Sequence, residues 1–107
     1  MPRVKGQKPM RERRYRASRL CRVIGNPLAY NIVMHVGSGV RTPTELAKSL
    51  NATIYAISVT LRMLRQIDVV RYETDGNRKR YWLKHPKLLR ALAQLEKVVD
   101  TMRWTEQ

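Results

Sequence analysis

The sequence is poor in several things that whole classes of protein require. Its 107 residues include one cysteine, Cys21, two histidines and no phenylalanine. A lone cysteine cannot close an internal disulfide, which argues against a disulfide-stabilised secreted protein and for a reducing, cytoplasmic setting. No apolar run reaches the roughly 18 residues that a membrane-spanning helix needs, so no membrane partner is expected. The length suits one small domain with a single modest core.

Acidic residues are also scarce. Eight Asp and Glu stand against 22 Lys and Arg, which gives a net charge of +14. Because such a charge repels itself in a compact state, a polyanionic partner is the simplest explanation. Residues 1–22 hold nine of the basic residues and one acid. We predict that residues 1–10, which lack a periodic apolar pattern, form a basic flexible arm that contacts phosphate or a minor groove. The alternative is a solvated, solubilising tail.

The residues that catalysis or metal binding would need are sparse too. The sequence has no HExxH motif, no nucleophile elbow and no Gly-rich phosphate loop, so we predict no enzyme activity and no cofactor. Cys21, His35 and His85 are of the right ligand types but lack the spacing of a metal site, so no metal is expected. Cys21 falls on an apolar stripe, where we expect a buried structural thiol. A redox role for Cys21 at an interface stays open.

Apolar residues recur at helical spacing through much of residues 11–84, which we assign to one domain. Helices are predicted over residues 11–24 and 27–36, each followed by glycine. The Thr-Pro-Thr-Glu sequence at residues 42–45 offers an N-cap, a first helical residue and the acid of a capping box, so it predicts the start of a short third helix.

A longer helix follows almost at once. Thr53 can cap a helix that runs to Gln66. Its inward face would carry three apolar residues, Ile57, Leu61 and Leu64. Two helices of this length joined by about three residues have the shape of a helix-turn-helix.

The pattern then changes to that of a two-stranded hairpin. Residues 69–74 are rich in β-branched and aromatic residues, residues 78–83 are predicted to form a basic second strand, and the Asp-Gly-Asn sequence between them predicts a tight turn. Alternation sends Arg78 and Arg80 to one side of the hairpin and Lys79 to the other. Tyr81 is expected to pack inward and Trp82 to lie on the outer face or in an interface.

Residues 85–107 are predicted to supply a terminal dimerisation helix over about residues 87–103. Apolar side chains recur along it at spacings of four and three residues: Leu88, Leu92, Leu95, Val99 and Met102. A seam this regular either folds back on the chain's own core or meets its copy across a two-fold axis. We favour the homodimer, because a core of this size is marginal without oligomerisation.

In this order the elements resemble the winged helix-turn-helix regulators of the ArsR type. The resemblance rests on Gly25-Asn26-Pro27-Leu28 ahead of Ile32-Val33, on Thr44-Glu45-Leu46-Ala47, on Ile57-Ser58 with Leu61 and Leu64, on Val69-Val70, and on Gly76, Arg78, Tyr81 and Leu83. It implies a mainly α fold with a small β-hairpin, dimerisation through terminal helices, and transcription regulation by DNA binding. The family's metal sensors carry paired cysteines in the positioning helix or His and acidic ligands in the last helix. This sequence has neither, so the resemblance argues against metal sensing.

If the partner is double-stranded DNA, the solvent face of residues 53–66 is the part that enters the major groove. The positioning helix and the basic hairpin, or wing, would add contacts to the backbone or the minor groove. The predicted DNA-binding residues are Thr44, Lys48, Tyr55, Ser58, Val59, Arg62, Arg78, Lys79 and Arg80. Arg62 suits guanine or phosphate, Ser58 a base edge or phosphate, and Val59 a thymine methyl group.

Several alternatives stay open at this point. Ile54, Tyr55 and Val59 are unusually apolar for residues that read bases, and they also suit a protein contact or an extended core. The basic strand of the wing also suits a solvated edge that resists aggregation. The whole domain could bind RNA by stacking bases on Tyr81 and Trp82, or bind DNA without sequence preference.

Overall fold

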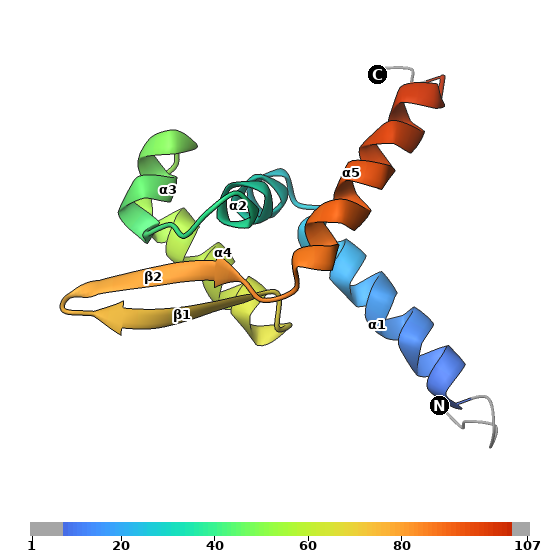
Figure 1. The fold of residues 1–107 in the computed structure, drawn as a ribbon, viewed down its shortest axis with the longest axis horizontal. Helices are drawn as coiled ribbons and strands as arrows, with labels where there is room; N and C mark the ends of the chain where they lie inside the picture. The colour runs from blue at the N-terminus through green and yellow to red at the C-terminus, as the bar shows by residue number, and fades with distance from the viewer. Residues whose placement is uncertain (1–7, 104–107) are drawn as a thin grey trace.

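The computed structural model describes residues 8–103 of the chain (Figure 1). Its elements, in order, are α1 (Lys8–Ile24), α2 (Pro27–Gly37), α3 (Pro43–Ser49), α4 (Ile54–Gln66), β1 (Val70–Asp75), β2 (Arg78–Leu83) and α5 (Pro86–Thr101). The hairpin runs alongside α2, α3 and α4 with its tip pointing away from α1 and α5, which diverge from the other side of this body (Figure 1). The fold is mainly α with one small β-hairpin, as predicted. None of the described helices is long and apolar enough to cross a membrane.

Side-chain caps fix where the central helices begin. The Asn26 side chain accepts hydrogen bonds from the backbone N–H groups of Leu28 and Ala29, and Pro27 occupies the first turn of α2. At α4, Thr53 Oγ1 accepts from Ala56 N at 3.0 Å. These side chains satisfy backbone donors that have no partner inside the helix. The predicted starts of both helices are therefore confirmed.

The start of α1 differs from the prediction. The helix begins at Lys8 rather than near residue 11, so the last three residues of the predicted arm are helical. The remainder of the predicted arm, residues 1–7, lies outside the described residues. Pro9 does not oppose the earlier start, because the first turn of a helix does not use the backbone N–H that proline lacks.

The core lies where α2 and α4 meet the hairpin. Ile57, Leu61 and Leu64 of α4 are fully buried, together with Ile32 and Val33 of α2 and Val70 of β1. Their burial supplies the main favourable free energy of folding, about 1.5–3 kcal/mol for each large aliphatic side chain. The inward face predicted for α4 is confirmed.

Only the C-terminal half of α1 and the N-terminal half of α5 pack against this core. On α1, Ile24 is buried, but Ala17 and Cys21 are exposed. The expectation of a buried Cys21 thiol is therefore wrong within the protomer. Most of α1 lies outside the core, and among its residues 12–24 the helix is buried only at its C-terminal residue, Ile24. On α5, Leu92 is buried and Leu88 half-buried, whereas Leu95, Val99 and Met102 are exposed.

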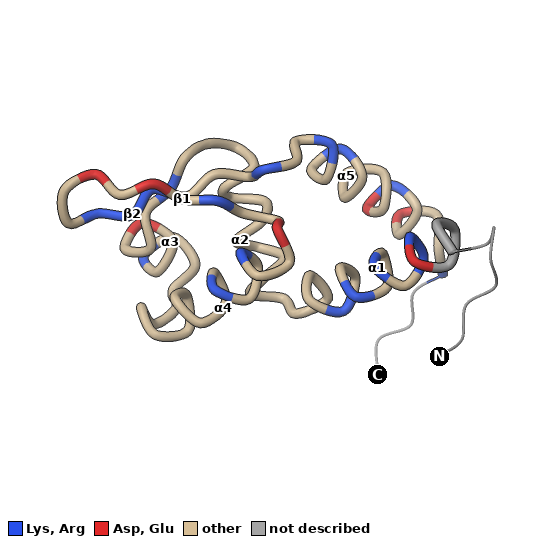
Figure 2. Tube along the Cα trace, turned by 90° about the horizontal axis from the view of Figure 1, so that it is seen from below, with Lys and Arg blue, Asp and Glu red and all other residues tan. Residues whose placement is uncertain are grey.

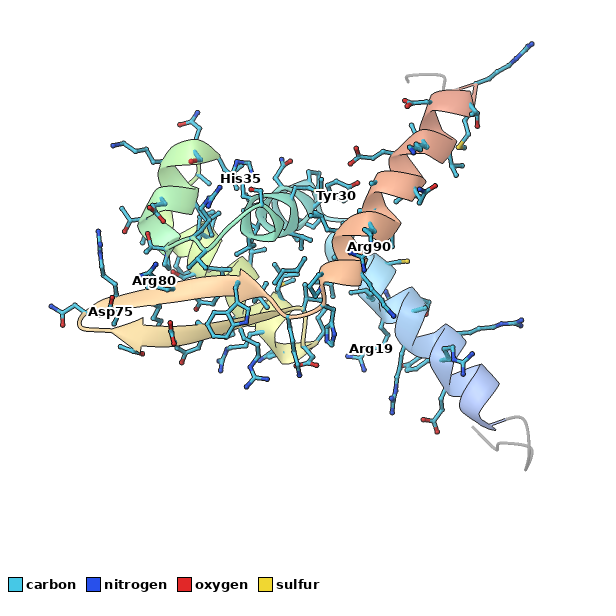
Figure 3. All side chains as sticks on the ribbon, viewed as in Figure 1. Arg19, Tyr30, His35, Asp75, Arg80 and Arg90 are labelled. Carbon is cyan, nitrogen blue, oxygen red and sulfur yellow. The ribbon has the colours of Figure 1, made fainter. Side chains whose placement is uncertain are left out.

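The predicted seam on α5 thus divides into two parts. Leu89 packs against the Gly37 backbone, and the Tyr30 hydroxyl of α2 donates a hydrogen bond to Glu96 Oε2 at 2.5 Å. Figure 3 shows Tyr30 on the side of α2 that faces α5. That hydrogen bond, together with burial and the Glu96 charge, raises the pKa of Tyr30 to about 12. The first half of α5 therefore folds back on the chain's own core, and the second half has no cover within the described protomer.

Candidate nucleic-acid interface

The buried residues of α4 determine which of its side chains face the solvent. Because Ile57, Leu61 and Leu64 point into the core, the opposite side of the helix is left in solvent. Tyr55 is 77% exposed, Ser58 and Arg62 are exposed, and Val59 is half-buried. The structure gives these four side chains the outward orientation expected from the sequence. Their contact with DNA stays a prediction.

Thr42 and Glu45 form a complete capping box at the start of α3. Glu45 N donates to Thr42 Oγ1 at 3.2 Å, and Thr42 N donates to Glu45 Oε1 at 2.8 Å. The hydrogen bond from the Thr42 backbone holds the pKa of the Glu45 carboxyl below its usual value. Thr44 and Lys48 are exposed on the same short helix. They therefore remain available as predicted backbone contacts, whereas the Thr42 side chain holds the helix end.

The hairpin has two chemically different faces. Antiparallel pairing places Tyr72 opposite Tyr81, Thr74 opposite Lys79 and Glu73 opposite Arg80. Because successive side chains alternate, Tyr72, Lys79 and Tyr81 share the face that carries the buried ends of the hairpin. Arg78, Arg80 and Trp82 lie on the other face. The predicted separation of Lys79 from the two arginines is confirmed, and so is the inward packing of Tyr81, which is buried.

Acidic groups partly neutralise the outer face of the wing. Asp75 pairs with Arg78 in the strand register, and Arg80 Nη1 lies 3.6 Å from Asp75 Oδ2. Figure 3 labels both partners of this ion pair on the hairpin. An exposed ion pair contributes little to stability, but its carboxylate lowers the local positive potential. Arg78 and Arg80 therefore have competing anions beside them.

The inner face of the wing gathers cations instead. The Lys79 ammonium lies 4.9 Å from the centre of the Tyr72 ring, and the Arg65 guanidinium of α4 lies 5.4 Å from it. Both distances allow a cation–π interaction. The Tyr72 and Tyr81 rings are themselves 5.1 Å apart. Burial raises the pKa of Tyr81, with the charges of Arg65 and Arg62 acting in the opposite direction.

Arg65 is the functional candidate that sequence reasoning missed. It follows Ser58 and Arg62 at helical spacings of seven and three residues, so the three share one side of α4. The spacing alone could have found it. What the sequence did not reveal is that this side of α4 faces Lys79 across Tyr72. We call Arg62, Arg65 and Lys79 the cationic row.

A second cluster joins the end of α4 to the start of α5. The Lys84 ammonium donates to both carboxylate oxygens of Asp68, at 2.9 and 2.8 Å, and His85 Nε2 lies 3.3 Å from Asp68 Oδ2. Asp68 has a φ of 68°, a left-handed conformation that Asp and Asn tolerate better than most residues. The hydrogen bonds from Lys84 and His85 lower the pKa of the Asp68 carboxyl. This cluster connects the turn after α4 to the turn that leads into α5.

The predicted absence of a metal site can be compared with the geometry of the described residues. Among residues 8–103, no group of three or more His, Cys, Asp and Glu side chains is placed to hold a metal ion. His35 Nδ1 lies 2.9 Å from the Asn31 carbonyl oxygen, and His85 belongs to the Asp68 cluster.

Figure 2 shows Lys and Arg distributed over α1, the hairpin and α5, with few acidic positions between them.

Comparison with solved structures agrees with this architecture. HlyU from Vibrio cholerae, in its reduced form, superposes with a TM-score of 0.75 at 20% identity, over 86% of this chain and 96% of that one. The transcriptional repressor BigR from Xylella fastidiosa gives 0.76 at 18% identity, over 94% and 98%. A homodimeric winged helix-turn-helix DNA-binding domain from Mycobacterium bovis, a possible ArsR-family transcriptional regulator, gives 0.77 at 17% identity, over 99% and 100%.

The chain has a winged helix-turn-helix fold. The fold-level resemblance to ArsR-type regulators that the sequence suggested is confirmed. No protein-family model and no curated protein sequence matches the chain. In folds of this class, the helices in the places of α3 and α4 are called the positioning helix and the recognition helix, and the hairpin is called the wing.

The Asp68 cluster predicts a pH-dependent contribution to stability. A carboxyl whose pKa is lowered by folding stabilises the native state above its unfolded pKa, about 3.9, and loses that effect as the pH falls through the lower native value. Asp68→Asn keeps the tolerance for positive φ but removes the charge. We expect a lower urea midpoint for Asp68→Asn than for the wild type at pH 7, and a smaller difference near pH 2. A difference that is equal at both pH values would contradict the assignment.

Proposed function

We propose that the chain is a transcriptional regulator that binds double-stranded DNA sequence-specifically as a homodimer. The recognition helix enters the major groove, and the wing contacts the backbone or the minor groove. The observation that carries this proposal is the cationic row. It places Arg62 and Arg65 on the exposed side of α4 and Lys79 on the adjoining face of the wing.

Electrostatics supports a polyanionic partner for this surface. A row of cations beside a solvent-exposed helix suits a phosphate backbone that runs along the edge of the groove the helix occupies. The chain's net charge of +14 supplies long-range attraction to the same partner. The similar structures named above also point to regulation, since one is described as a repressor and another as a DNA-binding domain.

The exposed second half of α5 supports the homodimer. Leu95, Val98, Val99 and Met102 are between 42% and 54% exposed, which leaves an apolar stripe in water. A groove of about 350 Å³ beside it is lined by Cys21 and Ile24 of α1, by Tyr30 of α2 and by Leu95. A second copy that covered this stripe would present two copies of α4, and binding to adjacent half-sites requires them to lie about 34 Å apart, one turn of DNA.

The RNA-binding alternative has less support. It requires Tyr81 and Trp82 to stack on unpaired bases. Tyr81 is 6% exposed and packs on Tyr72, so its ring is not available to a base. Trp82 is half-buried on the opposite face of the wing.

Selection of bound sequences from random duplexes tests the function. We expect the full chain to enrich an inverted repeat whose half-sites lie about one helical turn apart, because a two-fold dimer presents two identical helices. Competition with single-stranded RNA at the same salt concentration is the control. Failure to enrich any sequence would exclude a sequence-specific regulator and favour an architectural binder.

Removal of single cations tests the cationic row. Arg62→Ala, Arg65→Ala and Lys79→Ala should each reduce the slope of log affinity against log salt by about 1, because each lost phosphate contact releases about one counterion fewer. Arg90→Ala, which removes an exposed arginine from α5, is the matched control and should leave the slope unchanged. Fluorescence anisotropy with labelled duplex gives these slopes. Equal slopes for all four variants would contradict the assignment.

The dimer is tested by a charge on the α5 stripe. Leu95→Glu should yield a monomer at concentrations where the wild type is a dimer, since burying an unpaired carboxylate in an apolar interface is costly. Gln94→Glu introduces the same residue at a neighbouring exposed position and should leave the dimer intact. Sedimentation velocity measures the mass, and circular dichroism checks the helix content. An unchanged sedimentation coefficient for Leu95→Glu would exclude this interface.

A further inference from the structure

The exposed surface of α4 is more apolar than contact with water or phosphate requires. Ile54 is 49% exposed, Tyr55 77% and Met63 40%, and Val59 is half-buried. None of the four belongs to the core cluster or packs against it as a partly buried neighbour. Their exposure keeps apolar surface in water, which is unfavourable unless a partner covers it.

The major groove of DNA contains an apolar group that such a surface can contact. The edges of the bases present hydrogen-bond donors and acceptors, and a single apolar group, the 5-methyl of thymine. From this we infer that α4 reads thymine methyl groups through Val59, Ile54 and Tyr55, so that each half-site is rich in thymine. The inference rests on the proposed function and deepens it, because it specifies the sequence class that the helix accepts.

The hydrogen-bonding groups of α4 agree with this assignment. The helix contains no Asn, Lys, Asp or Glu, and its one Gln, Gln66, is its last residue. Bidentate reading of adenine, which needs Asn or Gln, is therefore confined to the end of the helix. Arg62 is the exposed side chain near the middle of the face that can hold guanine. A thymine-rich half-site follows from these residues, with guanine contacts limited to whichever of Arg62 and Arg65 does not bind phosphate.

Charge complementarity favours DNA over a protein as the occupant of this face. Arg62 follows Tyr55 by seven residues and Val59 by three, so cationic and apolar side chains share the exposed side of α4, and Lys79 of the wing continues the cationic row. A protein that covered the apolar side chains would also have to neutralise this row. A DNA duplex offers methyl groups in the groove and phosphates at its edge at the same time.

The experiment removes the methyl groups and nothing else. The full chain is titrated with the duplex obtained by selection, and then with duplexes in which uracil replaces thymine at each half-site. Uracil keeps every hydrogen bond of thymine and lacks only the 5-methyl. We expect each contacted thymine to lose about fourfold in affinity when replaced, the effect of one buried methyl group. Uracil at thymines outside the half-sites should change nothing.

Variants then link the methyl effect to the named side chains. Val59→Thr keeps the shape of the side chain but exchanges a methyl for a hydroxyl, and Ile54→Ala shortens a half-exposed side chain. Both should reduce the ratio of thymine to uracil affinity towards 1, a coupling that loss of stability would not produce. Val40→Thr makes the same exchange at a 45% exposed position between α2 and α3, outside α4 and the α5 stripe, and should leave the ratio unchanged.

The outcomes separate this inference from the proposed function. An enriched inverted repeat that binds equally well with uracil would overturn thymine reading and leave the regulator intact. A methyl effect of full size in both α4 variants would overturn the assignment to these residues. If Ile54→Ala and Val59→Thr changed neither affinity nor the ratio, the face would belong to a protein contact, and the inference would fail. If no sequence were enriched at all, the proposed function would fail first.

Discussion

The burial of one side of α4 is the constraint on which the rest of the structure depends. Ile57, Leu61 and Leu64 pack into the core that α2 and the hairpin complete, and this fixes the rotation of α4 about its own axis. A helix turned by one residue would expose these side chains and bury the polar stripe, at a cost of several kcal/mol. The direction in which Tyr55, Ser58 and Arg62 point is therefore a consequence of packing.

The wing extends the same constraint to a second element. Val70 and Leu83 anchor the base of the hairpin in the core, so strand alternation decides which of its cations approaches α4. Lys79 falls on the inner face, beside Tyr72 and Arg65, while Arg78 and Arg80 fall beside Asp75. The three adjacent basic residues of β2 thus have different surroundings, and the lysine is the one aligned with the recognition helix.

The two terminal helices show where a small core ends. A protomer of this size buries Ile24 of α1 and Leu92 of α5, but it has no further surface to cover Cys21, Leu95 or Met102. The Tyr30–Glu96 hydrogen bond connects α5 to α2, and the Asp68 cluster connects the turn before α5 to the turn after α4. The apolar stripe of α5 is therefore exposed on the surface of the protomer, where the second subunit of the proposed homodimer can cover it.

Local chemistry determined much of this protein from the sequence alone. Caps at Asn26, Thr42 and Thr53, the glycine turn of the hairpin and the apolar period of α4 each act within a few residues, so the elements and the outward face were predictable. Only the tertiary structure decided that Cys21 of α1 is exposed, and that the first half of the α5 seam packs on the protomer while the second half is exposed. Only the fold, likewise, brought Arg65 and Lys79 to one tyrosine ring. These features depend on contacts between residues far apart in the chain, which no local pattern records.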